Sequence, residues 1–406
     1  MTVSDASTFP RHQSLPSREH YPLVIIGSGA GGVSAARSYL DAAGPGPVLM
    51  VTEDIDPPYE RPPLSKEVLS GEKEPTGDPV NGEGLPDGVE LLLASSISAV
   101  DIEKQTVAAK SWSVEFDRLI VATGARSKSL HAAQEGAEIH LLRSLDDART
   151  LVASARTAYT ALVIGSGFIG CEAAASLAQR GLNVALVTPE NGPQEQRLGA
   201  AASSRIKDWL EAVGVEVRTG RSVKSVAAPR VVQLDDGTSL NPDLILAAVG
   251  VTPGGTLLDN SPAEVRGGRI MTDQHLKAHA TVWVAGDSAL AQHGVAGRPI
   301  MVEHWGDALA MGEIAGHNAA VEQNAQKSWD SIPGFWSIIG DHTLKYSAWG
   351  DGFSTAEFRE RPDGFVVWYG DERGELVGVL TYNSDDDYER GQHLLEQRAP
   401  LSHALK

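Results

Sequence analysis

The chain has 406 residues, which is long for a single hydrophobic core and predicts two or three domains. Lysine and arginine number 34 against 53 aspartate and glutamate, so the formal net charge is −19. A charge of this sign repels phosphate backbones and anionic lipid, and we therefore expect neither nucleic acid nor a membrane as a partner. Cys171 is the only cysteine, which excludes an intramolecular disulfide, a cysteine-pair redox centre and a cysteine-built metal site. We expect no metal.

The N-terminal segment, residues 1–20, is polar and contains no apolar run of the kind that a signal peptide needs. We expect it to be a disordered tail. No later stretch approaches about 18 uninterrupted apolar residues, the length required to span a membrane. These features together predict a cytoplasmic protein.

The first ordered pattern is a strand, a glycine turn and a helix. The apolar run 23–26 leads into Gly27-x-Gly29-x-x-Gly32, and small residues continue to Leu40 before a second apolar run at 48–51. In this motif the glycines allow a tight turn, a close approach of a pyrophosphate and close packing of helix on strand. Glu53 follows at about the distance where an acid binds ribose hydroxyls. The pattern predicts a dinucleotide site.

The same device recurs about 140 residues later in the chain. The run 161–164 leads into Gly165-x-Gly167-x-x-Gly170, a helix to about Gln179 and a strand at 184–187, with Glu190 in the place of the ribose acid. An acid there accepts a hydrogen bond from a free 2′-hydroxyl and repels a 2′-phosphate, which favours NADH over NADPH. Arg197 lies close enough in sequence to keep NADPH as an alternative.

The rest of the chain supplies the remaining strands of two sheets and a third region. Residues 101–118 alternate as antiparallel strands do, 281–287 form a strand that ends in Asp287, and 302–320 form a helix. From residue 331, alternating aromatic and polar residues between glycine turns predict an antiparallel sheet with a terminal helix. The run 385–387, three aspartates, is expected in a loop of that region.

Two dinucleotide sites in one chain indicate one tightly held cofactor and one exchanging substrate, as in an FAD enzyme reduced by a nicotinamide. We therefore expect an α/β fold with two Rossmann-like dinucleotide-binding domains, for FAD and NAD, and a C-terminal α+β domain. The expected boundaries are 21–150 with 279–328 for the FAD domain, 151–278 for the NAD domain, and 329–406 for the C-terminal domain.

Several further motifs resemble one superfamily. They are Pro58–Glu67, Ala122–Arg126, Ala285–Asp287, Glu303–Trp305 and Phe335–Ser337. With the two glycine loops, in this order, the chain resembles the pyridine-nucleotide-dependent FAD reductases. Within them it is similar to the oxygenase-coupled ferredoxin and rubredoxin reductases and to the apoptosis-inducing-factor-like flavoproteins. Two short segments, 189–192 and 335–340, favour the latter.

The resemblance implies two sets of cofactor-binding residues. The set implied for FAD is Gly27, Gly29, Ala30, Gly32, Glu53, Arg61, Lys66, Thr123, Gly124, Arg126, Asp287, Glu303, His304, Trp305 and Trp336. The set implied for NAD is Gly165, Gly167, Phe168, Ile169, Gly170, Glu172, Glu190 and Gly250.

The resemblance also implies five catalytic residues. Lys66 is expected beside the flavin and paired with Glu172, which places a positive charge where a reduced flavin develops negative charge. Phe168 is expected to gate or stack on the nicotinamide, and His304 and Trp336 to lie near both rings. Each aromatic residue could instead be core or interdomain packing. Cys171 is interpreted as a packing residue.

Two functions remain open at this stage. One is a reductase that passes electrons from NADH through FAD to a small iron–sulfur protein. The other is an apoptosis-inducing-factor-like redox sensor, in which a long-lived charge-transfer complex of reduced flavin and NAD controls dimerisation or partner binding. An acidic iron–sulfur partner would need a local basic patch, because the chain as a whole is acidic. A homodimer is a further expectation.

Overall fold

The computed structural model describes residues 15–406, and residues 1–14 of the expected disordered tail lie outside the described residues. The remainder of that segment is attached to the protein. The backbone N–H of Ser17 donates a hydrogen bond to Glu90 at 2.7 Å, and strand β1 already begins at His20. The expected tail boundary at residue 20 is therefore corrected, because these contacts tie the segment to the first sheet.

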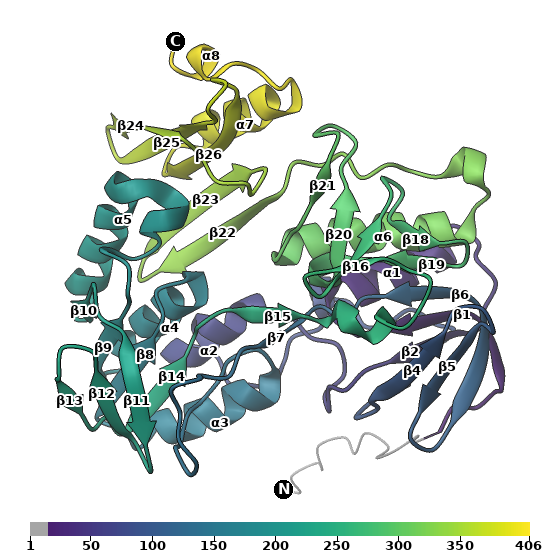
Figure 1. Cartoon of the computed structure of the whole chain (residues 1–406), viewed down its shortest axis with the longest axis horizontal. Coiled ribbons are helices and arrows are strands. Elements are labelled where there is room, and N and C mark those ends of the chain that lie inside the picture. The colour runs from purple at the N-terminus through teal and green to yellow at the C-terminus, as the bar shows by residue number, and fades with distance from the viewer. Residues whose placement is uncertain (1–14) are drawn as a thin grey trace, which may run out of the picture.

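An eight-stranded sheet forms the first of three regions (Figure 1). Its order is β18-β19-β6-β1-β2-β3, and β4 and β5 continue from β6 as an antiparallel extension. The strands are β1 (His20–Ile26), β2 (Val48–Val51), β3 (Val89–Leu92), β4 (Ile97–Asp101), β5 (Thr106–Ala109), β6 (Ser113–Val121), β18 (Lys277–His279) and β19 (Val282–Val284). The pairings among β1, β2, β3, β6 and β19 are parallel, and β2 is buried along its whole length. A buried parallel strand is a continuous apolar run, which is why the pattern at 48–51 predicted it.

Helices α1 (Ala30–Asp41) and α6 (Trp305–Ala320) pack against each other beside this sheet. Their backbones approach so closely that a Cβ on Gly312 would lie 2.3 Å from the carbonyl oxygen of Gly31, and one on Gly316 would lie 2.1 Å from that of Ala35. The absence of side chains at these two positions of α6 therefore brings the start of α6 next to the first glycine loop.

A four-stranded parallel sheet forms the second region, with the order β10-β9-β8-β14. Its strands are β8 (Thr160–Ile164), β9 (Asn183–Val187), β10 (Glu216–Arg218) and β14 (Leu244–Ala247). Its helices are α3 (Leu145–Ala155), α4 (Phe168–Gln179) and α5 (Glu195–Ala212). A small antiparallel sheet of β11 (Val223–Ala227), β12 (Val231–Leu234) and β13 (Ser239–Leu240) completes it. The two repeated units predicted from the glycine motifs are thus both present.

Two crossing strands connect the regions, β7 (Ala125–Ser127) and β15 (Val251–Pro253), and they pair antiparallel. After β15 the chain builds a four-stranded sheet of β16 (Val265–Arg266), β17 (Arg269–Thr272), β20 (Ala289–Gln292) and β21 (Pro299–Ile300). Because β17 pairs with β20, and β18 pairs with β19 of the first sheet, the chain leaves the second region before residue 265. The expected boundary at 278/279 is too late for this reason. At the other boundary, α3 packs with the second region although its first residues were expected in the FAD domain.

The third region is a five-stranded antiparallel sheet with two helices, and it confirms the expected α+β part of the fold. The order is β22-β23-β26-β25-β24. The elements are β22 (Gly334–Ile339), β23 (His342–Ala348), β24 (Thr355–Arg361), β25 (Gly364–Gly370), β26 (Leu376–Tyr382), α7 (Asp385–Glu396) and α8 (Leu401–Ala404). Helix α5 lies beside this sheet, where its Arg205 pairs with Glu360 of β24 (Figure 1).

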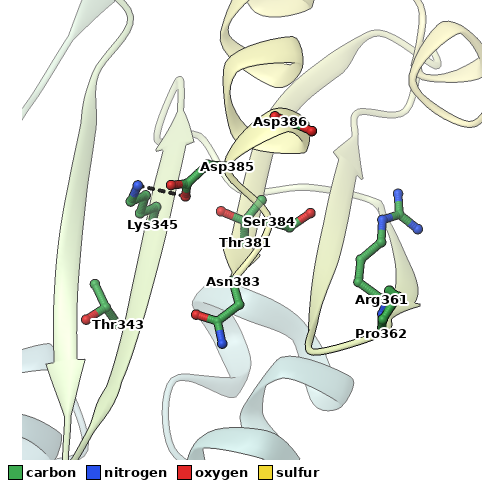
Figure 2. A pocket seen from close by; sticks show the side chains of 9 residues that line it. All are labelled: Thr343, Lys345, Arg361, Pro362, Thr381, Asn383, Ser384, Asp385 and Asp386. Atoms are coloured by element: carbon green, nitrogen blue, oxygen red, sulfur yellow. Dashed lines mark hydrogen bonds and ion pairs between the residues drawn. The ribbon is translucent and has the colours of Figure 1, made fainter.

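The aspartates 385–387, expected in a loop, instead form the first turn of α7. Acidic residues stabilise that end of a helix because its free N–H groups carry partial positive charge. Asp385 and Asp386 border a hollow of about 560 Å³ lined mostly by polar residues, in which Lys345 pairs with Asp385 (Figure 2). Since neighbouring strand residues point to opposite faces, Lys345 and Tyr346 lie on different sides of the sheet. The hollow is therefore on the face away from the site described next.

The remaining helical turns are short and position loops. They are η1 (Pro62–Ser65), α2 (Glu67–Ser70), η2 (Val80–Gly82), η3 (Gly254–Leu258), η4 (Gly286–Ser288) and η5 (Gln323–Ala325). Within residues 15–406, none of the helices has both the length and the apolar character of a membrane span.

Candidate functional site

The first glycine loop, between β1 and α1, is closely packed on one side and open on the other. Gly27 has φ +110°, and a Cβ there would lie 2.1 Å from the carbonyl oxygen of Ala122. A Cβ on Gly32 would lie 2.0 Å from the carbonyl oxygen of Gly27, whereas one on Gly29 would meet nothing within 4 Å. Gly29 is also the N-cap of α1, and no side chain caps this helix. The first turn, which includes Ala30, thus offers free N–H groups beside open space, which fits a pyrophosphate.

The second loop, between β8 and α4, repeats this geometry. Gly165 has φ +102° and its Cβ would lie 2.4 Å from the carbonyl oxygen of Ala248. Gly170 would meet the carbonyl oxygen of Gly165 at 2.0 Å, and Gly167 faces open space and caps α4 without a side-chain bond. Ile169 in this loop is 45% exposed. The residues present therefore fit two dinucleotides, one at each loop.

Glu53, the first ribose acid expected from the sequence, is already engaged by protein groups. It accepts a hydrogen bond from Ser96 at 2.5 Å and forms an ion pair with Arg126. Burial raises the pKa of Glu53, but these two partners outweigh burial and leave the pKa below its ordinary value. The ionised carboxylate is thus stabilised, and the structure brings Glu53 and Arg126 together as neighbours.

The other residues expected around FAD lie in the segment after β6 and at the start of α6. Thr123 donates to the carbonyl oxygen of Gly254 at 3.0 Å, and Gly124 has φ +61°. Glu303 pairs with Arg269, and Trp305 is the first residue of α6.

Arg143, which the sequence analysis missed, joins two of these residues. It donates to Asp287 at 2.7 Å, while its own carbonyl oxygen accepts a 2.7 Å hydrogen bond from Arg61. No local motif marks Arg143, because its role depends on long-range contacts.

Lys66 and Glu172 form the buried ion pair that the resemblance implied, at 2.8 Å between Nζ and Oε2. Their side chains are only 10% and 3% exposed. Lys66 also donates to the carbonyl oxygen of Pro62 at 3.1 Å. A buried pair of charges is tolerated when the remaining hydrogen-bonding positions are satisfied, and this one meets that condition.

Glu172 receives three further hydrogen bonds from two different regions. Ser65 donates to Oε2 at 2.6 Å, and Oε1 accepts from the hydroxyl of Ser337 at 2.8 Å and from the N–H of Ile338 at 3.2 Å. Glu172 therefore ties the helix after the second glycine loop to the Lys66 segment and to β22 of the third region. Ser65 and Ser337 were not singled out, although both lie inside the quoted motifs.

An aromatic cluster lies where the second loop meets β22. Phe168, the first residue of α4, packs edge-on against Phe335 with ring centroids 4.4 Å apart. Phe335 contacts His304 at 4.3 Å and Tyr346 at 5.2 Å. Burial, reinforced by the charge of Arg197, lowers the pKa of His304 to about 3, so its imidazole is neutral near pH 7.

Trp336 is not part of this cluster. It is 44% exposed, and alternation along β22 places it on the opposite face from Phe335. Phe335 thus lies between Phe168 and His304 and contacts both, while the expected positions of Phe168, His304 and Trp336 near the flavin and nicotinamide stay predictions. The two-residue period of the strand is the signal that separates Phe335 from Trp336, but it does not by itself tell which face is buried.

Four more residues lie on or next to the elements around the two loops: Asp307, Glu190, Gly250 and Cys171. Asp307 in the first turn of α6 is 5% exposed, and among residues 15–406 its Oδ2 has no hydrogen-bond partner. Burial raises its pKa to about 7. Glu190 follows β9 and accepts the N–H of Gln196 at 3.0 Å, and Gly250 precedes β15 with φ +98°. Cys171 is fully buried and burial raises its pKa, which agrees with packing.

The fold and the two loops define a flavin- and pyridine-nucleotide-dependent oxidoreductase. The chain belongs to the pyridine nucleotide-disulphide oxidoreductase family, whose model matches residues 21–323. Membership confirms the predicted class of enzyme, with FAD and NAD(H) as its cofactors. The single cysteine departs from the redox disulfide in the family's name.

Two relatives and one solved structure show the range of similarity. A rubredoxin-NAD(+) reductase of Pseudomonas putida is 27% identical over 80% of this chain and 85% of that protein. A putative mitochondrial apoptosis-inducing factor 1 of Drosophila melanogaster is 28% identical over 82% of this chain, which spans half of that protein. The crystal structure of a ferredoxin reductase for the CYP199A2 system from Rhodopseudomonas palustris has a TM-score of 0.83 at 26% identity, covering 94% and 96% of the two chains. Both predicted resemblances are thus found.

Proposed function

We propose that this protein is an NADH-dependent reductase that passes electrons through FAD to a small iron–sulfur protein. The observation that carries the proposal is the position of Glu172. It lies on the helix after the nucleotide loop and is bonded both to Lys66, in the FAD-side motif, and to β22. One buried group therefore joins the helix after the second glycine loop to the Lys66 segment and to the third region. When bound, FAD accepts a hydride from NADH and releases the electrons singly to an acceptor.

The chain's own residues then have distinct roles. The free N–H groups of α1 and α4 would hold the two pyrophosphates, and Phe168, Phe335 and His304 would supply aromatic surface for a bound nicotinamide. The Lys66 ammonium stabilises negative charge that develops on the reduced ring system. These groups align and stabilise reactants and form no covalent bond with them.

The chain has no cysteine pair that could accept the electrons, which favours an acceptor outside the protein. Cys171 is buried among residues of α4 and there is no second cysteine, so electrons cannot pass to a thiol pair of the same chain. The reductase relatives, a rubredoxin reductase and a ferredoxin reductase, are named for iron–sulfur acceptors. An acidic acceptor of this kind would need a local basic patch on this acidic chain.

The preference for NADH rests on Glu190. Its carboxylate follows β9, where the second ribose is held in this motif, and its partner there is a backbone N–H. A cytoplasmic location and a homodimer remain predictions of the same proposal.

Anaerobic stopped-flow mixing tests the function directly. The flavin-loaded protein is mixed with NADH and then with a reducible ferredoxin or rubredoxin. We expect rapid flavin bleaching and rapid recovery on addition of the acceptor. Bleaching that recovers no faster with the iron–sulfur protein than with buffer would contradict the proposal.

The second candidate is a redox sensor like the apoptosis-inducing factor. The aromatic cluster of Phe168, Phe335 and His304 favours it, because aromatic side chains that pack against a bound nicotinamide would slow its release. The same experiment separates the two functions. Slow bleaching, a persistent long-wavelength absorbance and an NADH-dependent change in sedimentation would support the sensor.

A further inference from the structure

Arg197 carries a positive charge beside Phe168, at the end of the second glycine loop, and has no carboxylate partner among the described residues. Among residues 15–406 no carboxylate lies within ion-pair distance of it, and its guanidinium sits 5.6 Å from the ring centroid of Phe168. The residue is exposed, although the chain carries 19 more negative than positive charges. What distinguishes this cation is its place beside the first residue of α4, at the start of the helix that follows the second glycine loop.

The segment that carries Arg197 is a single turn separated from the rest of α5. Gln194 has φ +60° on one side, and Gly199, with φ +81° and ψ 164°, interrupts the helix on the other. The N–H of Arg197 donates to the carbonyl oxygen of Gln194 at 3.0 Å. The turn 194–198 therefore has an orientation of its own, different from the axis of the helix that follows.

Two contacts hold this turn in place. The N–H of Gln196 donates to Glu190, the acid expected at the ribose, at 3.0 Å. On the other side, the hydroxyl of Tyr369 donates to the carbonyl oxygen of Leu198 at 2.9 Å, and both residues are buried. Tyr369 belongs to β25 of the C-terminal region. The turn 194–198 is thus connected to Glu190, to Tyr369 of the C-terminal sheet and, through Arg197, to Phe168.

The ligand of this cation follows from what surrounds it. Phe168 is the first residue of α4, next to Gly167, where free N–H groups face open space. A pyridine dinucleotide places its doubly charged pyrophosphate at such a helix start. Guanidinium binds phosphate oxygens in a bidentate manner, which makes arginine a strong phosphate ligand.

We propose that Arg197 binds the phosphates of the pyridine nucleotide, and that Tyr369 of the C-terminal region positions it through Leu198. The inference deepens the proposed function and rests on it. It means that the C-terminal region contributes to nucleotide affinity as well as to the aromatic cluster. It also assigns Arg197 to the pyrophosphate and not to the 2′-phosphate of NADPH, the role that its place in the sequence left open.

The test is equilibrium binding to the flavin-loaded protein, with NAD+ and ADP-ribose as probes and flavin fluorescence or calorimetry as readout. ADP-ribose retains the pyrophosphate but lacks the nicotinamide. We expect Arg197→Gln to raise the Kd of both probes by about tenfold or more, and Arg197→Lys to recover part of the affinity. Arg205→Gln is the matched control, since Arg205 lies on the same helix over Phe358 and pairs with Glu360. It should change neither Kd by more than about twofold.

Tyr369 is tested as a positioning residue by a double-mutant cycle. Tyr369→Phe alone should raise the Kd of ADP-ribose by about threefold, and it should have no further effect in the Arg197→Gln background. Additive effects in the cycle would show that Tyr369 acts only through general stability and would overturn its role.

The outcomes also separate this inference from the proposed function. Tight ADP-ribose binding that Arg197→Gln leaves unchanged overturns the inference alone, as does a loss of affinity confined to NADP+ when NADP+ is added as a third probe. Weakened binding together with no electron transfer to an iron–sulfur acceptor overturns the proposed function and supports the inference. A wild-type protein that binds neither NAD+ nor ADP-ribose overturns both.

Discussion

The two glycine loops have the same backbone geometry but different surroundings. Around the first loop, α6 packs so closely that a Cβ on Gly31 would lie 3.2 Å from the carbonyl oxygen of Ala308, and the ribose acid Glu53 is held by Ser96 and Arg126. At the second loop Gly167 and Ile169 are exposed.

The two acids differ in their partners. Glu53 is held by a hydroxyl and an ion pair, whereas Glu190 accepts one backbone hydrogen bond, and Arg197 nearby carries no ion pair among the described residues. The comparison teaches that the same loop geometry can be packed against a helix or left exposed, and that the packing is set by segments outside the loop.

The largest effect should come from placing a Cβ at the first residue of either loop. Gly27→Ala and Gly165→Ala each force a side chain against a backbone oxygen at a positive φ. We expect Gly27→Ala to abolish flavin retention, and Gly165→Ala to retain flavin while losing NADH binding. Bound flavin per chain and the Kd of NADH measure the two effects.

Gly29→Ala and Gly167→Ala are the matched controls, because a Cβ at either position meets nothing within 4 Å. Their thermal stability without nucleotide should be close to that of the wild type. Loss of flavin from Gly165→Ala would break the comparison, because the second loop would then help to retain the tightly held cofactor.

The second-largest effect concerns Glu172, which joins the Lys66 segment to α4 and β22. Glu172→Ala leaves the Lys66 ammonium buried without its partner, which costs about 3–5 kcal/mol of unfolding free energy. Urea unfolding of the flavin-loaded protein measures it. Lys66→Met should in addition lower the midpoint potential of the flavin, because a positive charge beside it is lost. An unchanged potential and an unchanged NADH reduction rate in both variants would remove the pair from the mechanism.

The third effect is a pH dependence beside the first loop. Burial raises the pKa of Asp307 to about 7 in the folded state, above its value in the unfolded chain. The folded state therefore holds the proton more tightly, and stability falls as pH rises from about 4 to about 7. Asp307→Asn should raise the unfolding free energy at pH 8 by up to roughly 4 kcal/mol and change it little at pH 4. Equal effects at both pH values would show that Asp307 does not titrate in this range.

The smallest effect sharpens the contrast between the two acids. Glu190→Gln should reduce the preference for NADH over NADPH by about tenfold, since a 2′-phosphate would no longer be repelled. Glu53→Gln should leave that ratio unchanged, because Glu53 belongs to the other loop. The ratio of kcat/KM for the two nucleotides measures both. A ratio that Glu190→Gln does not alter would place the ribose elsewhere.

The sequence by itself determined the elements whose causes are local. The glycine spacing, the apolar runs before each loop and the acids after them follow from steric and periodic rules within about 30 residues. For that reason both glycine loops, their helices and the five-stranded sheet were predictable. The motif resemblance extended this to the Lys66–Glu172 pair, whose partners are 106 residues apart.

Tertiary structure alone decided which side chains meet. It packed Phe335 against Phe168, added Arg143 beside Asp287, and surrounded Glu172 with Ser65 and Ser337. It also moved the domain boundary, because β17 pairs with β20 across an intervening strand pair. Burial and pairing depend on which distant segments pack together, and the chain's local pattern does not carry that information.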